Sequence, residues 1–67
     1  SSFLKNGFEK TCDELQIARD SRRMKIADYY IMKAILAGDD EKKQRLSNDR
    51  LELLLNIKHL NKKSYAK

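Results

Sequence analysis

The near absence of helix-interrupting residues constrains this chain more than any other feature. Its 67 residues include no proline and only two glycines, the two residue types that most disfavour a helix interior. Strong helix formers such as Ala, Leu, Lys, Glu and Arg dominate the rest of the chain. Asn6-Gly7-Phe8-Glu9 and Thr11-Cys12-Asp13-Glu14 both fit a capping box. We expect the first helix to start at the earlier one, near Asn6, because Phe8 then shares a face with Cys12 and Leu15. The sequence therefore predicts an all-α fold.

The clearest break in the chain is Gly38-Asp39-Asp40. Glycine suits the left-handed conformation that follows a helix end, and Asp39 or Asp40 can cap the next helix. We therefore expect an antiparallel helical hairpin, in which a long helix, this turn and a second long helix follow one another. The second helix is predicted from about Asp40 to about Lys63, and residues 64–67 are expected to be a frayed tail.

The first predicted helix has two apolar stripes on nearly opposite sides. One stripe is interrupted near Asp20 by basic residues. A second stripe, whose members recur every seven residues, begins near the same point. The segment is therefore either one long helix with two faces or two helices with a break near Asp20, which would give a three-helix bundle. We expect one long helix, because neither glycine nor proline forces a stop. The first stripe contains Phe8, Cys12 and Leu15, and the second contains Ile17, Met24 and Ile31.

Both predicted helices are apolar on more sides than one neighbour can cover. Residues 26–37 contain only two charged residues, Asp28 and Lys33, and a helix that is apolar nearly all round must be buried on several sides. A hairpin gives each helix one neighbour, so we expect two hairpins to pair into a four-helix bundle. The predicted oligomer interface comprises Ile26, Tyr30, Ile31, Ile35, Leu36, Leu46, Leu53, Leu54, Ile57 and Leu60.

The size of the chain also points to association. Residues 1–67 can form one small helical domain, and domains this small usually need disulfides, a metal or a partner for stability. Cys12 is the only cysteine and His59 the only histidine, which excludes an internal disulfide and a Cys/His zinc site. We interpret Cys12 as a small buried apolar residue. The chain does not begin with methionine, and we expect it to be a fragment of a longer protein.

The excess of positive over negative charge lies entirely in residues 41–67. Residues 1–40 hold seven basic and seven acidic residues, whereas residues 41–67 hold eight basic and three acidic residues, a net charge of +5. A basic helix can follow the phosphates of DNA or RNA, although solvation of an exposed helix face explains the same lysines. The nucleic-acid-binding candidates are Lys42, Lys43, Arg45, Arg50, Lys58, Lys62, Lys63 and Lys67.

These patterns favour a non-catalytic function. The sequence contains no glycine-rich phosphate loop, metal-ligand spacing or paired-carboxylate motif, so we expect neither catalysis nor a cofactor. The expected function is helical oligomerisation, with itself or with a partner helix, and nucleic-acid binding is the alternative. No apolar run is long enough for a membrane span. We expect an intracellular protein in a reducing compartment, with cytoplasm and nucleus both open.

Overall fold

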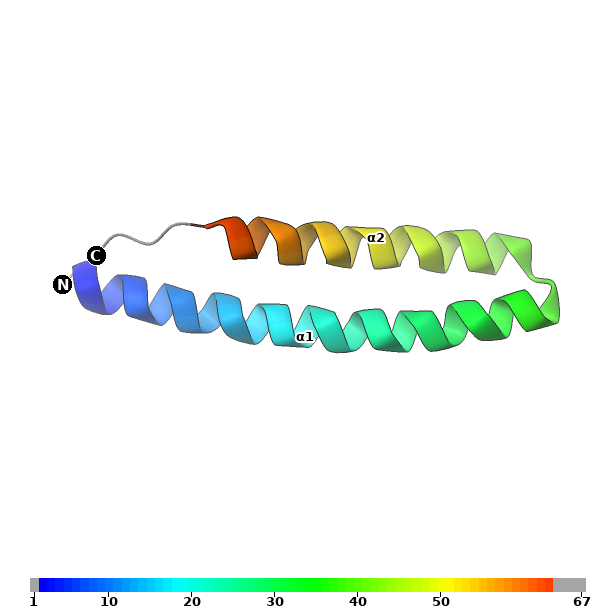
Figure 1. Ribbon diagram of the computed structural model, residues 1–67, viewed down its shortest axis with the longest axis horizontal. Coiled ribbons are helices and arrows are strands. Elements are labelled where there is room, and N and C mark those ends of the chain that lie inside the picture. The colour runs from blue at the N-terminus through cyan, green and yellow to red at the C-terminus, as the bar shows by residue number, and fades with distance from the viewer. Residues whose placement is uncertain (1, 64–67) are drawn as a thin grey trace.

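The computed structural model describes residues 2–63, which form two antiparallel α-helices and no strand. Helix α1 spans Ser2–Ala37 and helix α2 spans Asp40–Lys62, and the two lie side by side along their length (Figure 1). The molecule is a rod of 54 × 14 × 10 Å. The predicted helical hairpin is confirmed, and the second helix ends within one residue of the predicted position. The expected tail at residues 64–67 lies outside the described residues.

Helix α1 is continuous through Asp20 and Ser21, so the alternative of a three-helix bundle is wrong. One polar contact follows the helix here, since Gln16 Nε2 donates to Asp20 Oδ1 at 2.9 Å. The expected start near Asn6 is also wrong, since the helix already begins at Ser2. Asn6 and Gly7 are accommodated inside the helix, and the Thr11 hydroxyl donates back to the Gly7 carbonyl at 3.0 Å.

The turn between the helices follows the predicted chemistry. Gly38 has a φ of 69°, and the amides of Gly38 and Asp39 donate to the carbonyls of Ile35 and Ala34 at 3.1 and 2.9 Å. These bonds form a Schellman motif that satisfies the last carbonyls of α1. Asp39 caps α2, because its Oδ1 accepts from the Lys42 amide at 3.1 Å.

Replacing Gly38 with alanine tests this turn. We expect a loss of about 1 kcal/mol in the free energy of unfolding, because a side chain at positive φ is strained. A Cβ atom at Gly38 would meet nothing within 4 Å, so the loss is conformational. Gly7 is the matched control, since it also has open space around it but has no positive φ. Gly7→Ala should raise helicity. Equal thermal melts for Gly38→Ala and the wild type, followed by circular dichroism, would contradict this account.

The two helices meet along a seam of residues that recur at spacings of three and four. This is the heptad pattern by which helices pack side chains into one another. Every seam residue is buried or half-buried, whereas most of its neighbours are exposed. The seam comprises Asp13, Ile17, Asp20, Met24, Ala27, Ile31 and Ala34 from α1, and Lys43, Leu46, Arg50, Leu53, Ile57 and Leu60 from α2.

Apart from the layer of Asp20 and Ile57, the seam alternates layers of large apolar residues with layers that pair a small residue with a basic one. Ion pairs join Asp13 to Lys63 and Asp28 to Arg50, so these residues lie at matching levels of the two helices. In this register the large apolar residues of α1 lie opposite leucines of α2, and the small residues Ala27 and Ala34 lie opposite Arg50 and Lys43. The alanines leave room for the aliphatic stems of these basic residues, whose charged ends reach solvent. The large apolar layers pair Ile17 with Leu60, Met24 with Leu53, and Ile31 with Leu46.

The hairpin has almost no buried interior. Among the described residues only Ala34 and Asp20 are buried, with exposures of 3% and 2%. The remaining seam side chains are half-buried, so each large apolar residue gains only part of the hydrophobic stabilisation of a core position. Asp20 is also unfavourably placed, because it lies opposite Ile57 and its Oδ2 has no hydrogen-bond partner among residues 2–63.

Candidate association surfaces

The predicted interface residues divide into two groups. Five lie in the seam and are half-buried by the other helix of the same chain, so they hold the hairpin together. The other five lie outside the seam. The seam group is Ile31, Leu46, Leu53, Ile57 and Leu60, and the other group is Ile26, Tyr30, Ile35, Leu36 and the half-buried Leu54.

A second apolar stripe runs along the side of α1 that faces away from α2. We call it the outer stripe and define its apolar part as Phe8, Leu15, Ile26, Tyr29 and Leu36. These side chains recur at heptad spacing, and each is more than half exposed, with Leu36 reaching 80%. Tyr29 packs edge-on against Tyr30 with ring centroids 5.2 Å apart, and the Lys33 ammonium lies 5.5 Å from the centre of the Tyr29 ring.

A third apolar surface combines both helices. Met32, Ile35, Leu51 and Leu54 each follow a seam residue by one position. In the heptad pattern they therefore lie beside the seam, and all four are on the same broad side of the flat hairpin. We call this surface the broad side. Three of the four are more than half exposed, and Leu54 is half-buried. The opposite broad side carries charged residues of both signs, including Arg23, Arg45 and Glu52.

Several of the exposed apolar residues were not among the predicted interface candidates. Met32, Leu51, Phe8, Leu15 and Tyr29 were absent from the predicted interface, although the same heptad spacing runs through them. These residues can be identified from the angular position of each stripe around the helix relative to the seam. That position can be assigned only once the seam itself is known.

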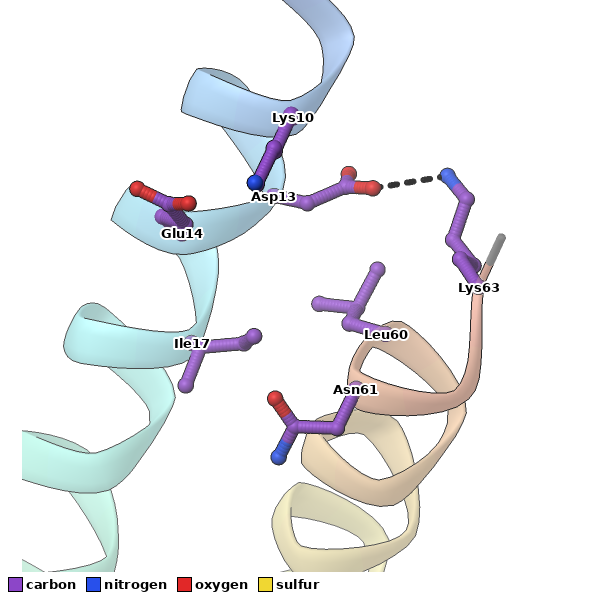
Figure 2. A pocket seen from close by; sticks show the side chains of 7 residues that line it. All are labelled: Lys10, Asp13, Glu14, Ile17, Leu60, Asn61 and Lys63. Atoms are coloured by element: carbon purple, nitrogen blue, oxygen red, sulfur yellow. Dashed lines mark ion pairs between the residues drawn. The ribbon is translucent and has the colours of Figure 1, made fainter. Parts of the chain in front are cut away.

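The open end of the hairpin contains a shallow groove of about 280 Å³. In Figure 2, Ile17 and Leu60 point toward each other at its floor, and Lys63 reaches across its rim to Asp13. Lys63 Nζ lies 2.9 Å from Asp13 Oδ2. The groove also includes Lys10, Glu14 and Asn61.

The ion pair at this groove is stable at neutral pH. The hydrogen bond that Lys63 donates to the Asp13 carboxylate raises the pKa of Lys63 above its ordinary value of 10.5, and charge attraction to Asp13 and Glu9 adds to the effect. A raised pKa in the folded chain means that protonated Lys63 favours folding. Its contribution is complete below pH 10.5 and is lost as the pH rises through the raised pKa. Because both groups are near solvent, the pair is worth little at any pH.

The predicted nucleic-acid-binding residues do not share one face of α2. Lys43 and Arg50 lie in the seam, and Arg50 Nε binds Asp28 Oδ1 at 2.5 Å. Lys63 is paired with Asp13. The four remaining described residues fall at two ends of the helix and on different sides of it. They are Lys42, Arg45, Lys58 and Lys62, while Lys67 lies outside the described residues.

Other kinds of site find little support within residues 2–63. No group of three or more His, Cys, Asp or Glu side chains in this range is arranged to hold a metal ion. Cys12 is exposed, so the expectation that it is buried is wrong. Its position on the side of α1 facing away from α2 explains the exposure. Within the same range, neither helix combines the length and the apolar character that crossing a membrane requires.

Comparisons with known proteins give no relative for this chain. No protein-family model, no curated protein and no solved structure matches it.

Proposed function

We propose that this chain is a non-catalytic helical association module whose hairpins pair with one another into a four-helix bundle. The observation that carries the proposal is the imbalance between burial and exposure. Ala34 is the only apolar residue of the described chain that is buried, whereas twelve large apolar side chains are exposed. A hairpin that buries so little needs further burial to reach ordinary stability.

The accessible surface area supports the same proposal. The hairpin exposes 5549 Å², whereas a compact monomer of the same mass exposes about 4,400 Å². The excess is about 1,100 Å², and a standard interface buries about 800 Å² from each partner. Pairing with one additional hairpin through an interface of that size would therefore cover most of the excess exposed surface of each chain.

The broad side is the surface best suited to a second copy. It is formed by both helices, so pairing there gives each helix two neighbours, as in a four-helix bundle. Its apolar residues Met32, Ile35, Leu51 and Leu54 share this side with the small residues Ala18, Ser21 and Ser47, and with charged residues that include Asp28 and Lys58. Small side chains at such positions allow close approach of two helical layers.

Replacing Leu51 with glutamate tests this proposal. The wild-type chain is expected to have twice the 7.9 kDa chain mass by light scattering, and a melting temperature that rises with concentration. Leu51→Glu should have the single-chain mass and a lower melting temperature, because a charge would be buried at the interface. Asn56→Glu is the control, since it adds the same charge at an exposed polar position, and it should retain the wild-type mass.

Other outcomes separate this proposal from the alternatives. A wild-type mass of 7.9 kDa at every concentration would contradict self-association, and so would an unchanged mass for both Leu51→Glu and Met32→Lys. Addition of a short DNA or RNA duplex tests the alternative function. Binding that weakens steeply with salt, and that is reduced by neutralising Lys58 and Lys62, would favour a nucleic-acid-binding module instead.

A further inference from the structure

The outer stripe of α1 is long enough to receive an entire helix. From Phe8 to Leu36 it covers about 42 Å of helix axis. Phe8 and Leu15 form one apolar end, and Ile26, Tyr29 and Leu36 form the other. Each of these five side chains is more than half exposed. Because α2 packs on the opposite side of α1, pairing through the broad side leaves this stripe uncovered.

Two arginines interrupt the stripe at its centre. Arg19 and Arg22 continue the heptad spacing between Leu15 and Ile26, and both are exposed. Neither forms an ion pair with any residue in the range 2–63, although Asp20 is their neighbour in sequence. Asp20 instead points into the seam, where it is buried. The stripe therefore presents apolar ends and an uncompensated positive centre.

A second copy of this chain is a poor occupant for the whole stripe. Parallel pairing in register places each arginine beside its own equivalent. Antiparallel pairing that covers both apolar ends centres on the same segment, and it again sets Arg19 and Arg22 against themselves. Like charges brought together at an interface oppose binding. The required complement is a helix with carboxylates at its centre, since arginine binds carboxylates in a two-pronged geometry.

We infer that the outer stripe binds an amphipathic helix of another protein, about 28 residues long, with apolar residues toward both ends and Asp or Glu at its centre. The apolar ends of that helix pack against Phe8, Leu15, Tyr29 and Leu36. Its central carboxylates bind Arg19 and Arg22. This binding goes beyond self-association and does not require it, because the two surfaces occupy different sides of α1.

The test is a binding titration with synthetic helices. A fluorescent helical peptide of about 28 residues, with leucines at heptad positions toward both ends and glutamates at its centre, is titrated with the intact chain and followed by anisotropy. Binding is expected, and a matched peptide with central lysines should bind at least about tenfold more weakly. The double variant Arg19→Glu, Arg22→Glu should reverse this preference. Lys58→Glu, Lys62→Glu is the control, with the same change of charge on α2, and it should retain the preference for glutamate.

The results distinguish this inference from the proposed self-association. Leu51→Glu should lose self-association and still bind the glutamate peptide. Equal binding of the two peptides, or no binding of either, would overturn the inference without bearing on the mass of the chain. A change in mass for Arg19→Glu, Arg22→Glu without peptide would also overturn it, since the stripe would then be the self-association surface. Binding of the wild-type chain to anionic lipid vesicles, but not to the glutamate peptide, would assign the stripe to a membrane surface instead.

Discussion

Replacing Asp20 with leucine is expected to raise the free energy of unfolding by about 1–3 kcal/mol. Asp20 is 2% exposed, and only one of its carboxylate oxygens has a partner, the Gln16 amide. The other oxygen is buried without a hydrogen bond inside the described chain. Leucine at this seam position removes that desolvated group and packs against Ile57. The gain would appear as a higher midpoint in chemical denaturation.

Asp20→Asn separates charge from polarity in this experiment. Asparagine retains an acceptor for Gln16 and removes the carboxylate, so its stability should lie between those of the wild type and the leucine variant. Light scattering on both variants checks that the oligomeric state is unchanged. A lower denaturation midpoint for Asp20→Leu would show that the carboxylate stabilises the fold, contrary to the expectation drawn from its unpaired oxygen.

Replacing Ile31 with aspartate is expected to unfold the hairpin. Ile31 lies in the seam opposite Leu46, in one of the large apolar layers of the α1–α2 contact. The substitution removes a large apolar side chain and inserts a charge without a partner, at a loss of about 2–4 kcal/mol. A domain of this size has only a few kcal/mol of stability. Far-ultraviolet circular dichroism should therefore show loss of most of the helical signal at room temperature.

Asn48→Asp is the matched control for this variant. It introduces the same charge at an exposed position of α2 and preserves the acceptor that receives the Gln44 amide at 3.0 Å. Its helical signal should equal that of the wild type. A folded Ile31→Asp variant that remains associated would show that the contact between α1 and α2 does not depend on this layer.

The fold was largely predictable because its determinants are local. Absence of proline gives the helices, and Gly38 with Asp39 gives the turn. These effects depend on a few neighbouring residues, so the hairpin and the bounds of the second helix followed directly. The start of α1 was predicted less well, since Asn6 suits both a cap and a helix interior. Nothing in the sequence decides between these roles when the preceding residues also allow a helix.

The candidate surfaces were less predictable, because the first helix offers two apolar stripes to a single neighbour. Five of the residues predicted for the contact between hairpins lie between α1 and α2. Leu15 and Tyr29, which were not among the predicted oligomer-interface residues, are exposed on the outer stripe. Hydrophobic spacing identifies a stripe, but it does not state which helix covers it. That choice depends on the combined packing of both helices.

The sequence by itself determined that this chain is helical, that it turns once at Gly38, and that its net positive charge lies after residue 40. Only the tertiary structure decided which stripe of α1 faces α2. The chosen seam includes the small residues Ala27 and Ala34, against which the long stems of Arg50 and Lys43 can pack. The arginine-interrupted stripe has no alanine among its residues and would give these stems less room. Packing against α2 therefore leaves that stripe exposed.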